Sequence, residues 1–177
     1  MCIPPPLIED GCTLHIISME KIPIYTEYRI VQECFYPEIG TRPILYVFHT
    51  KYTDHDEAIA AVHRNLQTAI SIRQNEPDRP PYEFIGDEYV TELFYRNSDG
   101  EKVIDTRYRI CPIEAFEHLT DDKRPRYYNS YKYRGYDISE NAQGNRFSVV
   151  INGHKTIKHK LNTLFDFIDG CILEMES

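Results

Sequence analysis

Hydrophobic residues recur along the chain at two spacings, and these spacings separate strands from helices. Residues 24–36 alternate, with Tyr28 and Cys34 in one register and charged residues in the other, which predicts a half-buried strand. Residues 44–49 are apolar in both registers and predict a central strand covered on both faces. The turn residues at 37–40, Pro-Glu-Ile-Gly, join the two segments into a predicted hairpin.

A helical period follows at residues 55–74. One stripe along this segment holds its apolar residues: Ile59, Val62, Leu66, Ala69 and Ile70. Asp54 and Glu57 have the spacing of a capping box, in which Asp54 accepts from the backbone N–H of Glu57 and Glu57 reaches back. The proline-rich residues 75–81 end the helix and form a stiff linker.

The next segment repeats the order strand, strand, helix. Residues 89–96 and 102–110 predict two strands joined by the turn Asn-Ser-Asp-Gly at 97–100. Pro112 suits the first position of a helix. Apolar residues then recur at helical spacing and predict a short helix that ends near residue 120: Ile113, Phe116 and Leu119.

The third segment predicts three strands and a helix. The strands are expected at residues 131–139, 146–151 and 154–158. Asn152-Gly153 predicts a two-residue turn that requires positive φ. Asn162 is expected to cap the last helix, whose apolar stripe is Leu161, Leu164, Ile168, Cys171, Ile172 and Met175.

The predicted element order is ββα-ββα-βββα. This order is typical of the α+β class, in which helices pack on one face of one or more antiparallel sheets. We expect a flexible N-terminal extension at residues 1–18 and three units at 19–76, 82–120 and 127–177. The units are expected to form one compact domain or two closely packed ones.

The cysteines bound the chemistry and the compartment. Their number is odd, and no Cys-x-x-Cys pair occurs among Cys2, Cys12, Cys34, Cys111 and Cys171. This predicts free thiols in a reducing compartment, with neither a disulfide framework nor a zinc site. No apolar run is long enough to cross a membrane. We therefore expect a cytoplasmic protein without cofactor or metal and without a membrane partner.

Charge is unevenly distributed. The chain carries a formal net charge of −8, yet residues 123–160 contain nine Lys or Arg and only two acidic residues, Asp137 and Glu140. The candidate interaction face taken from this basic segment is Lys132, Tyr133, Arg134, Tyr136, Arg146, Lys155 and Lys158. Three occupants fit it: the acidic remainder of the chain or of a second copy, an acidic protein partner, or nucleic acid, whose phosphates attract cations and whose bases stack on tyrosines.

Candidate catalytic chemistry is weak in this sequence. His55 and His63 are two helical turns apart, too far to share a metal ion without other ligands. Neither Cys34 nor Cys111 has the local signature of a nucleophile. We assign no catalytic residue and expect a non-enzymatic protein-interaction module, namely a small acidic inhibitor, immunity protein or regulator of microbial or mobile-element origin that covers a partner surface. The alternatives are a nucleic-acid-binding regulator that uses residues 123–160 and an enzyme whose site this pattern does not reveal; homo-oligomerisation also stays open.

Overall fold

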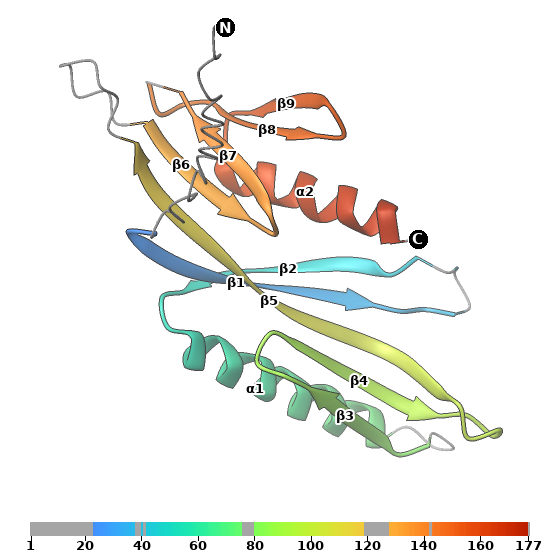
Figure 1. The fold of residues 1–177 in the computed structure, drawn as a ribbon. Helices are drawn as coiled ribbons and strands as arrows, with labels where there is room; N and C mark the ends of the chain where they lie inside the picture. The colour runs from blue at the N-terminus through green and yellow to red at the C-terminus, as the bar shows by residue number, and fades with distance from the viewer. Residues whose placement is uncertain are drawn as a thin grey trace, which may run out of the picture.

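The fold consists of one antiparallel sheet and two helices. The computed structural model describes residues 23–37, 40, 42–75, 80–118, 128–141 and 143–176, so the expected N-terminal extension lies outside the described residues. Within that part of the chain, nine strands form a single sheet, which confirms the α+β class (Figure 1). No described helix is both long enough and apolar enough to cross a membrane.

The sheet has a long central strand with other strands on both of its edges. The first five strands are β1 (Tyr25–Cys34), β2 (Ile44–Tyr52), β3 (Tyr82–Gly86), β4 (Val90–Arg96) and β5 (Lys102–His118). The last four are β6 (Tyr128–Tyr133), β7 (Tyr136–Glu140), β8 (Phe147–Ile151) and β9 (His154–Lys158). The helices are α1 (His55–Gln74) and α2 (Leu161–Glu176). The order across the sheet is β2-β1-β5-β6-β7-β8-β9, and β3 joins through β4 to β5.

Strand β5 connects the two halves of the sheet. One edge of β5 pairs with β1, while the other pairs first with β4, up to Arg109, and then with β6, from Ile113 onward. Pro112 lies in the gap between these two ladders. Ile110 donates its N–H on that side to the carbonyl oxygen of Tyr89, and on a strand the residue two positions later has its N–H position on the same edge. Pro112 has no N–H, but its position on this edge falls in the gap between the two ladders. No hydrogen bond of the sheet is therefore lost there.

The short helix predicted near residues 113–120 is wrong, because β5 continues to His118. Burial alternates here: Ile113 and Ala115 are buried, whereas the residues that follow each of them, Glu114 and Phe116, are partly exposed. This alternation has the period of a strand. Pro112 suits a helix start in isolation, but here it occupies a strand position that has a partner on one edge only.

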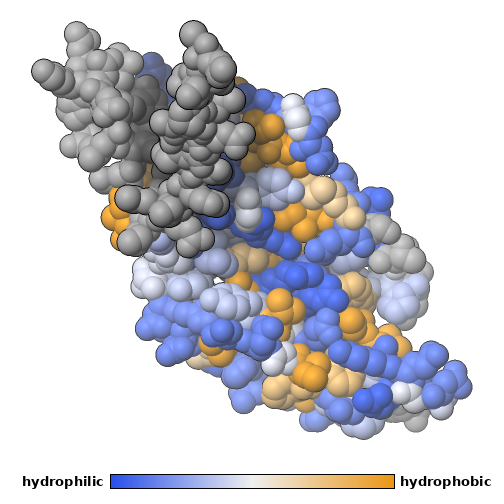
Figure 2. All heavy atoms as spheres, in the orientation of Figure 1, coloured by the Kyte–Doolittle hydropathy of each residue, from blue (hydrophilic) through white to orange (hydrophobic). Residues whose placement is uncertain are grey.

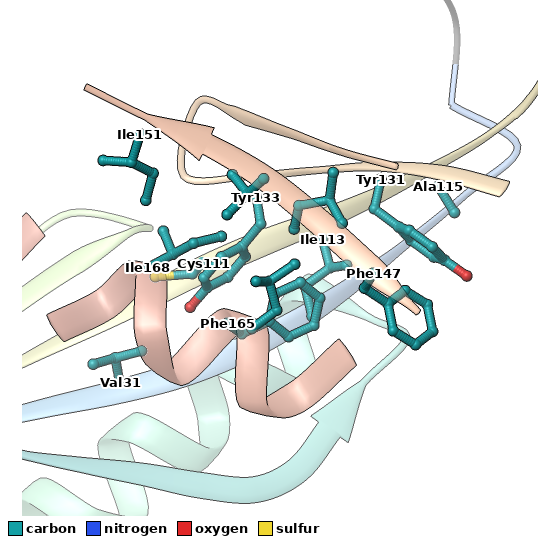
Figure 3. Close-up of a cluster of buried hydrophobic side chains, with 13 residues drawn as sticks. Val31, Cys111, Ile113, Ala115, Tyr131, Tyr133, Phe147, Ile151, Phe165 and Ile168 are labelled. Carbon is teal, nitrogen blue, oxygen red and sulfur yellow. The ribbon is translucent and has the colours of Figure 1, made fainter. Parts of the chain in front are cut away.

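The two helices cover opposite faces of the sheet, so the expected packing on one face is wrong. Ile30 and Val31 are adjacent on β1, and both are fully buried, but in different cores. The core under α1 contains Ile30, Ala58, Ala61, Val62, Leu66, Tyr82, Leu93, Tyr108 and Ile110. The core under α2, shown in Figure 3, contains Val31, Cys111, Ile113, Tyr133, Ile138, Val149, Leu164, Phe165 and Ile168, among others. Because side chains alternate along β1 and β5, each of these strands supplies both cores.

Helix α1 has the predicted bounds, but its cap differs in detail. The side chain of Asp54 accepts from the backbone N–H of Asp56 at 2.7 Å, not from Glu57. At the other helix, Leu161 is the first residue of α2, so Asn162 lies in the first turn instead of capping it.

A hairpin replaces the single strand predicted at residues 131–139. The chain reverses at Arg134 (φ 48°) and Gly135 (φ 83°), the same pair of positive φ angles that Asn152 (50°) and Gly153 (78°) adopt in the predicted turn. Positive φ is unfavourable for a residue with a Cβ. Arg134 adopts it in a position where its side chain pairs with Asp169 of α2 at 2.9 Å.

Candidate functional site

The residues predicted to form a basic face do not share one surface. Lys132 is exposed on β6, between the buried Tyr131 and Tyr133, so it points away from α2. Lys155, exposed on β9 opposite Val150, also points away from α2, since Val149 and Ile151 are buried beneath that helix. Lys158 lies on the other face, with its Nζ 5.4 Å from the ring centroid of Phe167 in α2.

The other predicted members of this face lie elsewhere. Arg146 is exposed just before β8. Tyr136 is half-buried and lines a cleft between the two halves of the sheet. Tyr133 is fully buried in the core under α2, and Arg134 is held by the ion pair described above. The structure therefore places Lys132 and Lys155 on one exposed face, whereas Tyr133, Arg134 and Lys158 lie on the α2 side.

Asp169 organises a buried polar cluster beneath α2. Its carboxylate accepts from the hydroxyl of Tyr133 at 3.0 Å and from Nη1 of Arg134 at 2.9 Å, and Nη2 of Arg29 is 3.7 Å away. Burial raises the pKa of Asp169, although both arginines act in the opposite direction. Burial likewise raises the pKa of Tyr133, which keeps its hydroxyl protonated as a donor. The Asp169 carboxylate, the Tyr133 hydroxyl and the Arg134 guanidinium thus have partners within the cluster.

A second polar network crosses the sheet on the face opposite α1. Glu33 is buried between Arg107 and Arg109, at 3.2 Å and 2.6 Å. Arg107 continues to Glu92 at 2.8 Å, and Glu92 to Lys102 at 2.7 Å. Burial by itself would raise the pKa of Glu92, but hydrogen bonds from Lys102 and Arg107 bring it below its ordinary value. Every charge named in this network has a partner of opposite sign, so we interpret the network as structural.

A cleft of about 560 Å³ lies between the two halves of the sheet. Its lining includes Tyr89, Arg109, Cys111, Arg134, Tyr136 and Met175. Burial raises the pKa of the Cys111 thiol to about 11, so it is protonated at neutral pH and is a poor nucleophile. Arg109 and Arg134 are already paired with Glu33 and Asp169.

The three free edges of the sheet differ in how they are protected. Among the described residues the sheet ends at β2, β3 and β9. Strand β9 carries Lys155 and Lys158, and β3 is a short strand of five residues, both of which discourage pairing with another chain. Strand β2 is nine residues long, and the stretch Ile44–Phe48 has no charged side chain. The edge position contradicts the predicted central position of β2.

Strand β2 exposes apolar side chains beside two hollows. Ile44 is 42% and Tyr46 is 49% exposed. On the α1 side lies an open groove of about 530 Å³, lined by Gln32, Tyr36, Tyr46, Val47 and Phe48. On the α2 side lies a smaller cavity of about 130 Å³, lined by Arg29, Val47, Phe48, Lys51, Asn162 and Asp166. On the face shown in Figure 2, by comparison, apolar residues form small patches separated by hydrophilic ones.

The sequence pattern missed this edge for an identifiable reason. Apolar residues in both registers are typical of a central strand, but they also fit an edge strand that contributes to two cores. Leu45 packs against the core under α2 and Phe48 against the core under α1. The sequence offered no counter-signal in this stretch, because residues 44–48 contain neither the charges nor the Pro that mark edge strands.

The described residues include no group of three His, Cys, Asp or Glu side chains that could hold a metal ion. No family model, no curated protein and no solved structure matches the chain.

Proposed function

We propose that this protein is a protein-binding module that holds an extended segment of its partner along the free edge of β2. The observation that carries the proposal is a nine-residue edge strand whose stretch Ile44–Phe48 is uncharged, with a hollow on each side of it. Backbone N–H and C=O groups of an edge strand bind another strand, and pockets for alternate side chains give such an interaction its specificity. A protein that holds a partner in this way covers part of its surface and so acts as an inhibitor or regulator.

The exposure of the edge supports this proposal. A long apolar edge is a liability in a protein that has no use for it, because it pairs with other chains indiscriminately. The β1–β2 ladder is irregular between Arg29 and Val31, and on the other side of that irregularity the pairing is regular from Val47 to Ile44. The charges on β9 are the usual protection against such pairing, and the stretch Ile44–Phe48 lacks them. Retention of the unprotected edge is explained if a specific strand occupies it.

The polar groups of the structure support a binding role over an enzymatic one. In the described part of the chain, the buried carboxylates Glu33 and Asp169 are each held by arginines. The cleft between the halves contains a protonated thiol and two paired arginines. An enzyme of ordinary type places a nucleophile or base of perturbed pKa where substrate can reach it.

The nucleic-acid alternative receives less support from the geometry. A phosphate-binding surface needs several cations on one face. Here Lys132 and Lys155 point away from α2 and Arg146 is exposed just before β8, but Lys158 lies on the α2 side and Arg134 is neutralised by Asp169.

The test is selection of short random peptides on the purified protein, followed by affinity measurement on variants. Peptides with alternating apolar residues should be enriched, and their NMR footprint should lie on β2 and β1. The double substitution Ile44→Lys and Tyr46→Lys places charges at exposed side chains of the edge, so it should abolish binding without unfolding the protein.

A matched control is available on another edge. Ile157→Lys changes an equally exposed apolar side chain on β9 and should leave the affinity for the selected peptides unchanged. If binding survives the β2 substitutions, or the footprint falls on another strand, the proposal is wrong.

A further inference from the structure

The small cavity on the α2 side of β2 contains an unusual buried donor. Arg29 is 3% exposed and lines the cavity, and its Nη2 pairs with Asp166 and approaches Asp169. Its Nε–H, however, has no hydrogen-bond partner among the described residues. A buried N–H without an acceptor is energetically unfavourable and is rare in folded proteins. Because Arg29 lines the cavity, an acceptor that enters it would contact this side chain.

Two further features around the cavity favour an anionic acceptor. Lys51 of β2 lines it and pairs with Glu27 at 3.4 Å, an ion pair that is itself partly exposed. Asn162 lines it from the first turn of α2, where backbone N–H groups lack helical acceptors and the helix dipole is positive. The cavity thus combines an unsatisfied guanidinium N–H, an ammonium group and the start of a helix.

The charge and size of the cavity indicate which anion it accepts. Three ionised residues line the cavity, namely Arg29, Lys51 and Asp166. Ion pairs connect them to three more, namely Glu27, Asp169 and Arg134. These charges balance, so a single negative charge is better accommodated than a doubly charged phosphate. A volume of about 130 Å³ is enough for a carboxyl group but too small for a nucleotide.

We infer that this cavity binds the carboxylate of an Asp or Glu side chain in the partner strand at β2, an inference that rests on the proposed function. Val47, Phe48 and Lys51 all belong to β2 and line the cavity, so a side chain of the adjacent strand can enter it. Strand β2 contains no Asp or Glu, so β2-to-β2 pairing of two copies would supply no carboxylate. The net charge of −8 on each copy also opposes that dimer. The partner therefore presents an extended segment with an acidic residue.

The first test does not need the partner. The Nε–H of Arg29 gives its own signal in a ¹H–¹⁵N correlation spectrum, and it can be followed while sodium acetate replaces sodium chloride at constant ionic strength. We expect a saturable shift of this signal. Inorganic phosphate, added in a parallel titration, should bind more weakly than acetate.

Three variants sharpen the titration. Lys51→Gln should weaken acetate binding about tenfold, the order expected for loss of one charge-assisted hydrogen bond. Glu27→Gln removes the competing carboxylate and should strengthen it. Lys132→Gln, an exposed lysine on another strand, is the matched control and should change nothing.

The outcomes separate this inference from the proposed function. If acetate causes no saturable shift, or Lys51→Gln leaves the affinity unchanged, the carboxylate site is refuted, while peptide binding at β2 can still be observed. If phosphate binds more tightly than acetate, the cavity has another ligand and the inference is also refuted. For peptides selected at β2, changing the acidic residue to its amide should weaken binding about tenfold in wild type, and by less in Lys51→Gln.

Discussion

Removal of the Asp169 carboxylate should be one of the most destabilising single changes in the protein. Its side chain is 1% exposed and accepts hydrogen bonds from Tyr133 and Arg134, with Arg29 at 3.7 Å. Asp169→Ala leaves Arg29 and Arg134 without this counter-charge in a buried site and orphans the Tyr133 hydroxyl. Removing one partner of a buried ion pair costs about 3–5 kcal/mol. At about 2–4 °C per kcal/mol for a chain of this size, the melting temperature should fall by roughly 6–20 °C.

A neighbouring residue on the same helix provides the control. Asp166 also pairs with Arg29, but its side chain is 59% exposed. Because water screens such a pair, Asp166→Ala should cost about 1 kcal/mol or less. Urea unfolding followed by circular dichroism measures both changes, and equal m-values would show that both variants unfold from the same compact state. A cost for Asp169→Ala below about 1 kcal/mol, or equal to that of Asp166→Ala, would refute the stabilising role of the cluster.

Three further predictions follow from the same structure. Burial raises the pKa of Cys111 to about 11, so as the pH rises the thiol loses its proton in the unfolded chain before it does in the folded protein. The free energy of unfolding should therefore fall from about pH 9 to pH 11, and Cys111→Ala should flatten that fall in urea titrations at a series of pH values. Leu66→Ala should lower the free energy of unfolding by about 2–5 kcal/mol because Leu66 is 1% exposed, and a cost under about 1 kcal/mol would contradict its place in the α1 core. In a gel shift with mixed-sequence DNA and RNA at about 50 mM salt, we expect no retardation, and retardation that Lys155→Glu abolishes would instead favour nucleic-acid binding. Arg134→Glu should lower the melting temperature because Arg134 pairs with Asp169, whereas Lys155→Glu should not.

Local patterns were sufficient for the elements whose signals are local. The helix at residues 55–74 and the turn at Asn152-Gly153 were both predicted from spacing and turn chemistry, and the structure confirms them. A helix stripe and an Asn-Gly turn depend on residues within a few positions of one another. The antiparallel pairing of β1 with β2 was predicted as well, because the two strands follow one another in the chain.

Other features depended on contacts between residues far apart in the sequence. Ile113 to His118 became strand because β6 pairs with the whole segment and β1 pairs with it as far as Ala115, which outweighs the local preference of Pro112 for a helix start. The turn at Arg134 forms where its side chain meets Asp169, 35 positions later, a contact that no local pattern reports.

The candidate binding edge shows the same division between sequence and tertiary structure. The apolar character of residues 44–48 is visible in the sequence, but whether a second strand covers them is decided by the order of the strands in the sheet. The cavity beside that edge depends on Arg29 of β1, Lys51 of β2 and Asn162 of α2 coming together. A strand pattern states which residues share a face but not which helix covers it, since alternation supplies both faces equally. The choice of face, and with it the site, was made only when the two helices packed on opposite sides of the sheet.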